Sequence, residues 1–126
     1  MTKHMSPLNI AIIDDDESVL DAIETVLDDQ HWMTQTYISG EAFLFDLQDL
    51  EPDCIILDAN LPGLSGEAIA QRVARDYIDI PILVLTAYPN SPQTMKIKQL
   101  GARDILVKPV TAHVLIERIQ AVVKTS

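Results

Sequence analysis

The chain has 126 residues, 48% of them apolar, which suits one compact domain with a core and excludes a disordered acidic tail. Its formal net charge of −10, from 19 acidic and 9 basic residues, repels nucleic acid phosphates and favours a metal cation or a basic partner surface. With one cysteine, Cys54, no apolar run of transmembrane length and no secretion signal, the sequence predicts a cytoplasmic protein without membrane contact.

Five short apolar runs alternate with longer segments and predict five β-strands. Four of the runs are nearly continuous in apolar residues, which is typical of parallel strands covered on both faces. The second run alternates between polar and apolar residues, so we place it at an edge of the sheet. In chain order the predicted strands are 8–13, 33–38, 54–57, 82–85 and 105–107.

The segments between the runs carry apolar residues at helical spacing and predict five helices. A polar residue that can cap the helix precedes each of them. These residues are Asp16, Ser39, Ser65, Ser91 and Thr111. Gly101 is a suitable stop for the fourth helix, and we expect Met33 and Met95 to fill the core.

The alternation of strands and helices predicts an α/β fold, a doubly wound five-stranded parallel sheet with five flanking helices. In such sheets the functional crevice lies at the carboxyl ends of the strands, where the strand order reverses. The search for a site therefore starts with the residues that follow each strand.

Polar residues follow or end four of the predicted strands. Asp14, Asp15 and Asp16 come after the first strand, and Asp58 comes after the third. Carboxylates that are packed together must raise a pKa or bind a cation. Because the ligands would all be oxygen and no His/Cys cluster suggests zinc, Mg²⁺ is the best-matched ion, with Mn²⁺ as the alternative.

Thr86 ends the fourth strand and Lys108 follows the fifth, and together with the carboxylates they point to phosphoryl transfer. A carboxylate is a competent nucleophile that can form an acyl phosphate. The transition state spreads negative charge over three phosphoryl oxygens. The metal, the Lys108 ammonium and the Thr86 hydroxyl can each stabilise one of these oxygens.

Over nearly its whole length the chain resembles the receiver domains of two-component response regulators. The matching pieces are Ile-Ile-Asp-Asp-Asp-Glu at 12–17, Leu-Asp-Ala-Asn-Leu-Pro-Gly-Leu-Ser-Gly at 57–66, Leu-Thr-Ala at 85–87, Gly-Ala at 101–102 and Lys-Pro at 108–109. Each piece alone is weak, but together, in order and at strand ends, they are specific. On this basis we divide the chain into an N-terminal extension (1–7), a receiver domain (8–124) and a tail (125–126).

The resemblance implies a flavodoxin-like receiver fold with strand order 2-1-3-4-5 and a role for each site residue. Asp58 matches the phosphoacceptor, Thr86 the switch hydroxyl and Lys108 the phosphate-sensing lysine, with a cis peptide bond before Pro109. The implied Mg²⁺ ligands are Asp14, Asp15, Asp58 and the backbone carbonyl of Asn60, with Asp15 a more direct ligand than Asp14.

The same resemblance implies partners. The phosphoryl donor would be a phosphohistidine on a sensor histidine kinase or a histidine phosphotransfer protein. Phosphorylation would shift the face made by the fourth helix, fifth strand and fifth helix (87–100 and 105–123), which would bind an output domain or partner or form a homodimer. Because the opening acidic run is most similar to nitrogen-fixation and LuxR-type transcription regulators, we expect the N-terminal receiver of a longer regulator, with a stand-alone receiver as the alternative.

Two positions depart from the family pattern. Ile105 stands where receivers commonly carry Tyr or Phe, and Val110 stands where a Phe often follows the Lys-Pro pair. The usual aromatic toggle therefore cannot work, and we expect Tyr88 to cover the site in its place. The phosphoryl chemistry is unaffected, whereas the route of the output signal is open.

Three other readings remain. A haloacid-dehalogenase-like phosphohydrolase also uses an aspartyl phosphate, but it prefers a second Asp where this chain has Asn60 and usually carries a cap domain. A flavodoxin-like electron carrier needs a Ser/Thr/Gly-rich phosphate loop after the first strand, where this chain is acidic. A degenerate receiver that acts only as a docking module is favoured by Ile105 and opposed by the intact acidic set.

Overall fold

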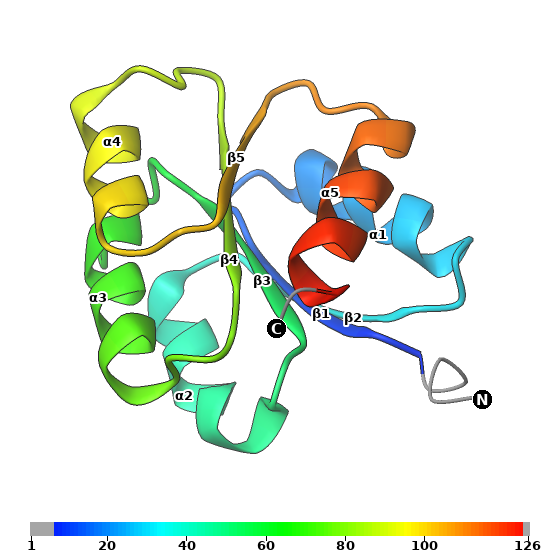
Figure 1. The fold of residues 1–126 in the computed structure, drawn as a ribbon, viewed down its shortest axis with the longest axis horizontal. Coiled ribbons are helices and arrows are strands. Elements are labelled where there is room, and N and C mark those ends of the chain that lie inside the picture. The colour runs from blue at the N-terminus through cyan, green and yellow to red at the C-terminus, as the bar shows by residue number, and fades with distance from the viewer. Residues whose placement is uncertain (1–6, 125–126) are drawn as a thin grey trace.

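The computed structural model describes residues 7–124, so the predicted tail and all but Pro7 of the predicted N-terminal extension lie outside the described residues (Figure 1). The elements in chain order are β1 (Asn9–Ile13), α1 (Glu17–Asp28), β2 (Met33–Tyr37), α2 (Gly40–Leu50), β3 (Cys54–Asp58), α3 (Gly66–Asp76), β4 (Ile82–Thr86), α4 (Pro92–Gln99), β5 (Asp104–Val107) and α5 (Ala112–Lys124). Every predicted strand is present, with its ends within one residue of those expected. Among these residues no helix has the length and apolarity needed to cross a bilayer.

All neighbouring strands are parallel, and their order is β2-β1-β3-β4-β5, as the resemblance implied. The order reverses between β1 and β3, because β1 pairs with β2 on one side and with β3 on the other. The register pairs Ile13 with Leu57, Asp58 with Leu85, and Thr86 with Val107. The carboxyl ends of β1, β3, β4 and β5 therefore meet at one edge of the sheet.

Helices cover both faces of the sheet, with α1 and α5 on one face and α2, α3 and α4 on the other (Figure 1). Successive strand residues point to opposite faces, so β1 contributes Ile10 and Ile12 to the first layer and Ala11 and Ile13 to the second. The central strands β3 and β4 are buried along their whole length. The edge strand β2 is only partly buried, which fits its more polar sequence.

The predicted caps are present at the helix starts. Side-chain oxygens accept backbone N–H bonds two or three residues ahead, and each such cap stabilises a helix by about 1 kcal/mol. The capping pairs are Asp16 with Ser18, Ser39 with Ala42, Ser65 with Ala68, Ser91 with Thr94, and Thr111 with Val114. Gly101 follows the end of α4 with φ +118°, a conformation that favours glycine.

The prediction that Met33 and Met95 fill the core is wrong. The side chains of Met33 and Met95 are 56% and 44% exposed. Met33 is the first residue of the edge strand β2, in which no residue is fully buried. In α4 the inner face is formed by Thr94 and Ile97, which are both fully buried, so Met95 lies one position off that face.

Candidate functional site

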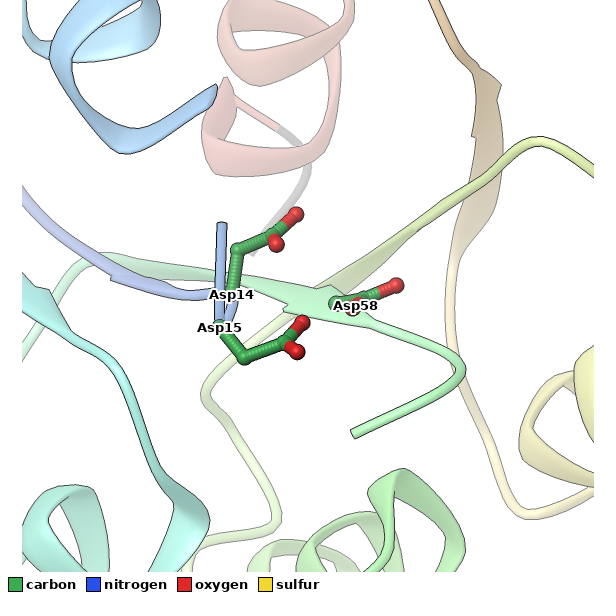
Figure 2. Close-up of side chains that lie close together, drawn as sticks. All are labelled: Asp14, Asp15 and Asp58. Atoms are coloured by element: carbon green, nitrogen blue, oxygen red, sulfur yellow. The ribbon is translucent and has the colours of Figure 1, made fainter. Parts of the chain in front are cut away.

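Three aspartates gather at the carboxyl edge of the sheet. Asp14 follows β1 and is fully buried, Asp15 is exposed, and Asp58 is the last residue of β3 and is 4% exposed. Figure 2 shows their three carboxyl groups close together beside the ends of β1 and β3. One oxygen from each lies within 4.8 Å of the others. The structure therefore brings together the carboxylates that the sequence placed at separate strand ends.

Backbone hydrogen bonds fix the orientation of Asp14. Its N–H donates to the carbonyl of Tyr37 at 3.0 Å, and its Oδ1 accepts from the N–H of Asp16 at 2.9 Å. Its other oxygen, Oδ2, is buried as well and is the oxygen that faces the Lys108 ammonium, at 2.9 Å. A buried carboxylate needs a positively charged partner, a role that Lys108 takes here and that a metal cation could share.

Lys108 reaches the carboxylates from the end of β5. Its ammonium lies 2.9 Å from Asp14 Oδ2 and 3.6 Å from Asp58 Oδ1. The backbone N–H of Lys108 donates to the carbonyl of Thr86 at 2.8 Å, which extends the β4–β5 ladder to the site. The peptide bond between Lys108 and Pro109 is cis, as expected. The predicted meeting of Lys108 with Asp58 is thus confirmed.

Burial and like charge act on Asp58 in the same direction. Burial is the main cause that raises the pKa of Asp58, and the Asp14 charge adds to it, while Lys108 opposes both. Burial lowers the pKa of Lys108, but its contacts with Asp14 and Asp58 outweigh that effect, and the net direction is upward. Lys108 therefore stays cationic at neutral pH, while Asp58 gives up its proton less readily than an exposed aspartate.

Asn60 and Thr86 flank this centre. The backbone N–H of Asn60 donates to Asp58 Oδ1 at 3.3 Å, so the loop after β3 orients the carboxylate. Thr86 is fully buried, and its hydroxyl accepts from the N–H of Tyr88 at 2.9 Å. Tyr88 itself is 68% exposed, which argues against the expectation that it covers the site.

Asp16 has a separate role from the other two acidic residues of its run. Its carboxylate accepts from both the hydroxyl and the N–H of Ser18, at 2.6 and 2.9 Å, and these bonds lower its pKa. It therefore caps α1, as its place before the helix predicted, and leaves the ion-binding geometry to Asp14, Asp15 and Asp58.

Gly66, the first residue of α3, sets how closely that helix approaches the site. A Cβ at this position would lie 2.9 Å from the carbonyl oxygen of Asp58 and 3.1 Å from Ile97 Cδ1. A side chain would have to push α3 away from the end of β3. The glycine was part of the matching motif, but only the structure reveals the close approach.

Thr94 was missed at the sequence level. It is fully buried in α4, and its hydroxyl lies 3.4 Å from that of Thr86. Its position three residues before Ile97 places both on one face of the helix, which was a usable signal. Because threonine is polar, a pattern of apolar residues alone does not include it in the inner face of the helix.

Comparison with known proteins identifies the family. Residues 10–120 match the response regulator receiver domain. The transcriptional regulatory protein AfsQ1 of Streptomyces coelicolor is 36% identical over 116 residues, covering 92% of this chain and 51% of that protein. The transcriptional regulatory protein FixJ of Bradyrhizobium diazoefficiens is 29% identical, covering 92% of this chain and 57% of that protein. The chain thus spans about half the length of these relatives, and the subfamily stays a prediction.

Solved structures agree in fold and size. A putative response regulator from Chloroflexus aurantiacus has a TM-score of 0.88 and 30% identity, covering 94% of this chain and 99% of that one. The chemotaxis protein CheY4 of Vibrio cholerae has a TM-score of 0.85 and 29% identity, covering 93% and 99%. With the family match over residues 10–120, the chain belongs to the receiver domains of two-component response regulators.

Proposed function

We propose that Asp58 accepts a phosphoryl group from a phosphohistidine on a sensor histidine kinase or a histidine phosphotransfer protein. The observation that carries this proposal is the position of the Lys108 ammonium, 3.6 Å from Asp58 Oδ1, beside the three-carboxylate cluster. An ammonium held there faces the negative charge that a phosphoryl group brings to the acceptor.

In the transfer step a carboxylate oxygen of Asp58 attacks phosphorus, and the bond between phosphorus and the donor's imidazole nitrogen breaks. The imidazole takes a proton from solvent, and Asp58 becomes an acyl phosphate. Attack by water on phosphorus later releases inorganic phosphate and restores the carboxylate. The chain thus catalyses only its own modification and turns over no separate substrate.

The ligand set fits Mg²⁺, or Mn²⁺ in its place. The carboxylates of Asp14, Asp15 and Asp58 supply oxygens within 4.8 Å of one another, and the backbone carbonyl of Asn60 would complete the protein's share. Asp14 and Asp58 are both buried and share the single Lys108 ammonium, so a second cation would offset the remaining negative charge of the cluster. When bound, the ion neutralises charge on the phosphoryl oxygens.

Lys108 and Thr86 act on the phosphoryl oxygens from the protein side. The Lys108 ammonium pairs with one oxygen, and the Thr86 hydroxyl donates to another once it turns away from Tyr88. The movement of Thr86 is the event that signals phosphorylation to the rest of the domain. It would shift the face formed by α4, β5 and α5.

The altered face would regulate an output domain or partner, or form a homodimer. Transcriptional regulators of about twice the length are among the relatives of this chain. We therefore propose that residues 8–124 are the receiver of a regulator that acts on transcription. The net charge of −10 supports an indirect action, without contact between this segment and nucleic acid. We place this function in the cytoplasm, where the free buried thiol of Cys54 stays reduced.

Intact-mass spectrometry tests the proposal. The chain is treated with phosphoramidate, whose P–N bond resembles that of phosphohistidine, and with Mg²⁺. We expect the mass of one phosphoryl group to be added to the wild type, and none to Asp58→Asn or after chelation of the metal. An unmodified wild type, or an equal adduct on Asp58→Asn, contradicts the proposal. Sustained release of phosphate from added phosphomonoesters would favour the phosphohydrolase reading.

A further inference from the structure

A chain of buried hydroxyls connects Thr86 with the start of α4. The Thr94 hydroxyl lies 3.4 Å from Thr86 Oγ1 and 3.0 Å from the carbonyl oxygen of Tyr88. It also accepts from the Ser91 hydroxyl at 3.0 Å, while Ser91 Oγ accepts the N–H of Thr94 as the helix cap. Thr86 is therefore hydrogen-bonded to the first turn of α4, one of the elements of the face formed by α4, β5 and α5.

Counting hydrogens shows how this arrangement can change. Thr94 has one hydroxyl hydrogen and two acceptors within reach, Thr86 Oγ1 and the Tyr88 carbonyl. If Thr86 leaves, the Thr94 hydrogen keeps the nearer Tyr88 carbonyl as its acceptor, so the buried Thr94 hydroxyl stays paired. The departure of Thr86 therefore costs the bonds that it accepts from Thr94 and from the Tyr88 N–H, but it does not orphan the Thr94 hydroxyl.

The aromatic position of the family pattern offers no such link. Ile105 is half-buried and packs against the core layer under α2, α3 and α4, and its side chain has no polar atom. Thr86 accepts from Thr94 and from the Tyr88 N–H, so both lone pairs of its oxygen are used. Thr86 must give up these two bonds to reach a phosphoryl group.

We propose that Thr94 is a positioning residue whose hydroxyl holds Thr86 in its unphosphorylated position and transmits the movement of Thr86 to α4. This inference rests on the proposed function of Asp58 and goes beyond it by naming the route of the switch. Removal of the Thr94 hydroxyl frees Thr86 in advance, so binding of a phosphoryl group no longer has to break that bond.

The test measures binding of beryllofluoride, a tetrahedral phosphoryl analogue, in the presence of Mg²⁺. In Thr94→Val, which keeps the shape and removes the hydroxyl, we expect roughly two- to threefold tighter binding, the lower end of what one net hydrogen bond represents, because the Thr94 hydrogen is shared with the Tyr88 carbonyl. Thr94→Ser, which keeps the hydroxyl, should bind like the wild type. Thr25→Val controls for the same chemical change at an exposed helix position away from the site, where the hydroxyl donates to the Asp21 carbonyl within α1.

Amide hydrogen exchange over residues 87–99 supplies the second readout. In the wild type beryllofluoride should change exchange in the first turn of α4, and in Thr94→Val that response should be lost. A looser helix alone would raise exchange without tightening the analogue. Unchanged affinity in Thr94→Val, or an equal change in Thr94→Ser, overturns the inference.

Two further outcomes are informative. If Thr94→Val does not fold, Thr94→Cys replaces it, because a thiol of similar size is a weak donor and tolerates burial. A wild-type response in Thr94→Cys contradicts the inference, and an intermediate affinity supports it. If the wild type takes up neither phosphoryl group nor analogue, the proposed function fails first, which separates the two claims.

Discussion

Replacement of Asp58 by asparagine should stabilise the fold in the absence of metal. At an effective dielectric of about 20, a carboxylate oxygen within 4.8 Å repels the Asp58 charge by at least roughly 3 kcal/mol, and the ammonium 3.6 Å away attracts it by roughly 5 kcal/mol. Burial opposes the charge on Asp58 most strongly, and the repulsion from Asp14 adds to it and exceeds the attraction to Lys108. Asp58→Asn should therefore gain about 1–2 kcal/mol in the free energy of unfolding.

Thermal unfolding without divalent metal at pH 7 measures this gain, which corresponds to a midpoint increase of roughly 3–10 °C for a domain of this size. The pKa of Asp58 is raised in the folded state, so the charge on Asp58 costs stability above that pKa and none below the unfolded value of about 3.9. The difference between variant and wild type should shrink as the pH falls through the raised pKa.

Asp15→Asn provides the control for this experiment. Its carboxylate is exposed, so solvent screens it and its replacement should stabilise less than that of Asp58. A destabilised Asp58→Asn at pH 7 would refute the electrostatic reasoning. So would a gain that stays constant between pH 7 and acid pH.

Three further predictions follow from the same geometry. Lys108→Met removes the cation that pairs with Asp14 and Asp58. The variant should therefore form the adduct more slowly in the phosphoramidate assay and unfold at a lower temperature without metal. An undiminished rate of adduct formation would contradict the role of Lys108. Gly66→Ala should lower the free energy of unfolding in urea by roughly 1–3 kcal/mol, because the new Cβ would lie 2.9 Å from the Asp58 carbonyl oxygen. A neutral effect would show that α3 can move away without cost. Mg²⁺ at about 100 times its dissociation constant should raise the free energy of unfolding of the wild type by about 2.7 kcal/mol. The same Mg²⁺ concentration should stabilise Asp14→Asn much less. Equal stabilisation of the two proteins would place the ion elsewhere.

The fold was predictable because its strands are buried on both faces. β3 and β4 are buried along their whole length, so their sequences are continuous apolar runs that are easy to recognise. Each predicted strand boundary lies within one residue of the observed one. The caps were equally direct, since Ser39 or Ser65 before an apolar period has few other roles. The positions of Met33 and Met95 depended on tertiary packing at an edge strand and on a short helix, which periodicity does not resolve.

The candidate site was predictable in its members and less so in its connections. Parallel strands bring their carboxyl ends to one edge, so Asp14, Asp58 and Lys108 had to approach one another once the strands were placed. The link from Thr86 to Thr94 depends on the angle at which α4 packs against β4, which the sequence does not specify. Hydrogen-bond partners of that kind need coordinates.

The most direct measurement of the central claim locates the phosphoryl group on the chain. The protein is treated with phosphoramidate and Mg²⁺ and then reduced with borohydride, which converts an aspartyl phosphate into homoserine, and the peptides are sequenced by tandem mass spectrometry. The account predicts homoserine at position 58 alone, lost when the metal is chelated. Homoserine at Asp14 or Asp15 instead, or a modification that persists in Asp58→Asn, would contradict it.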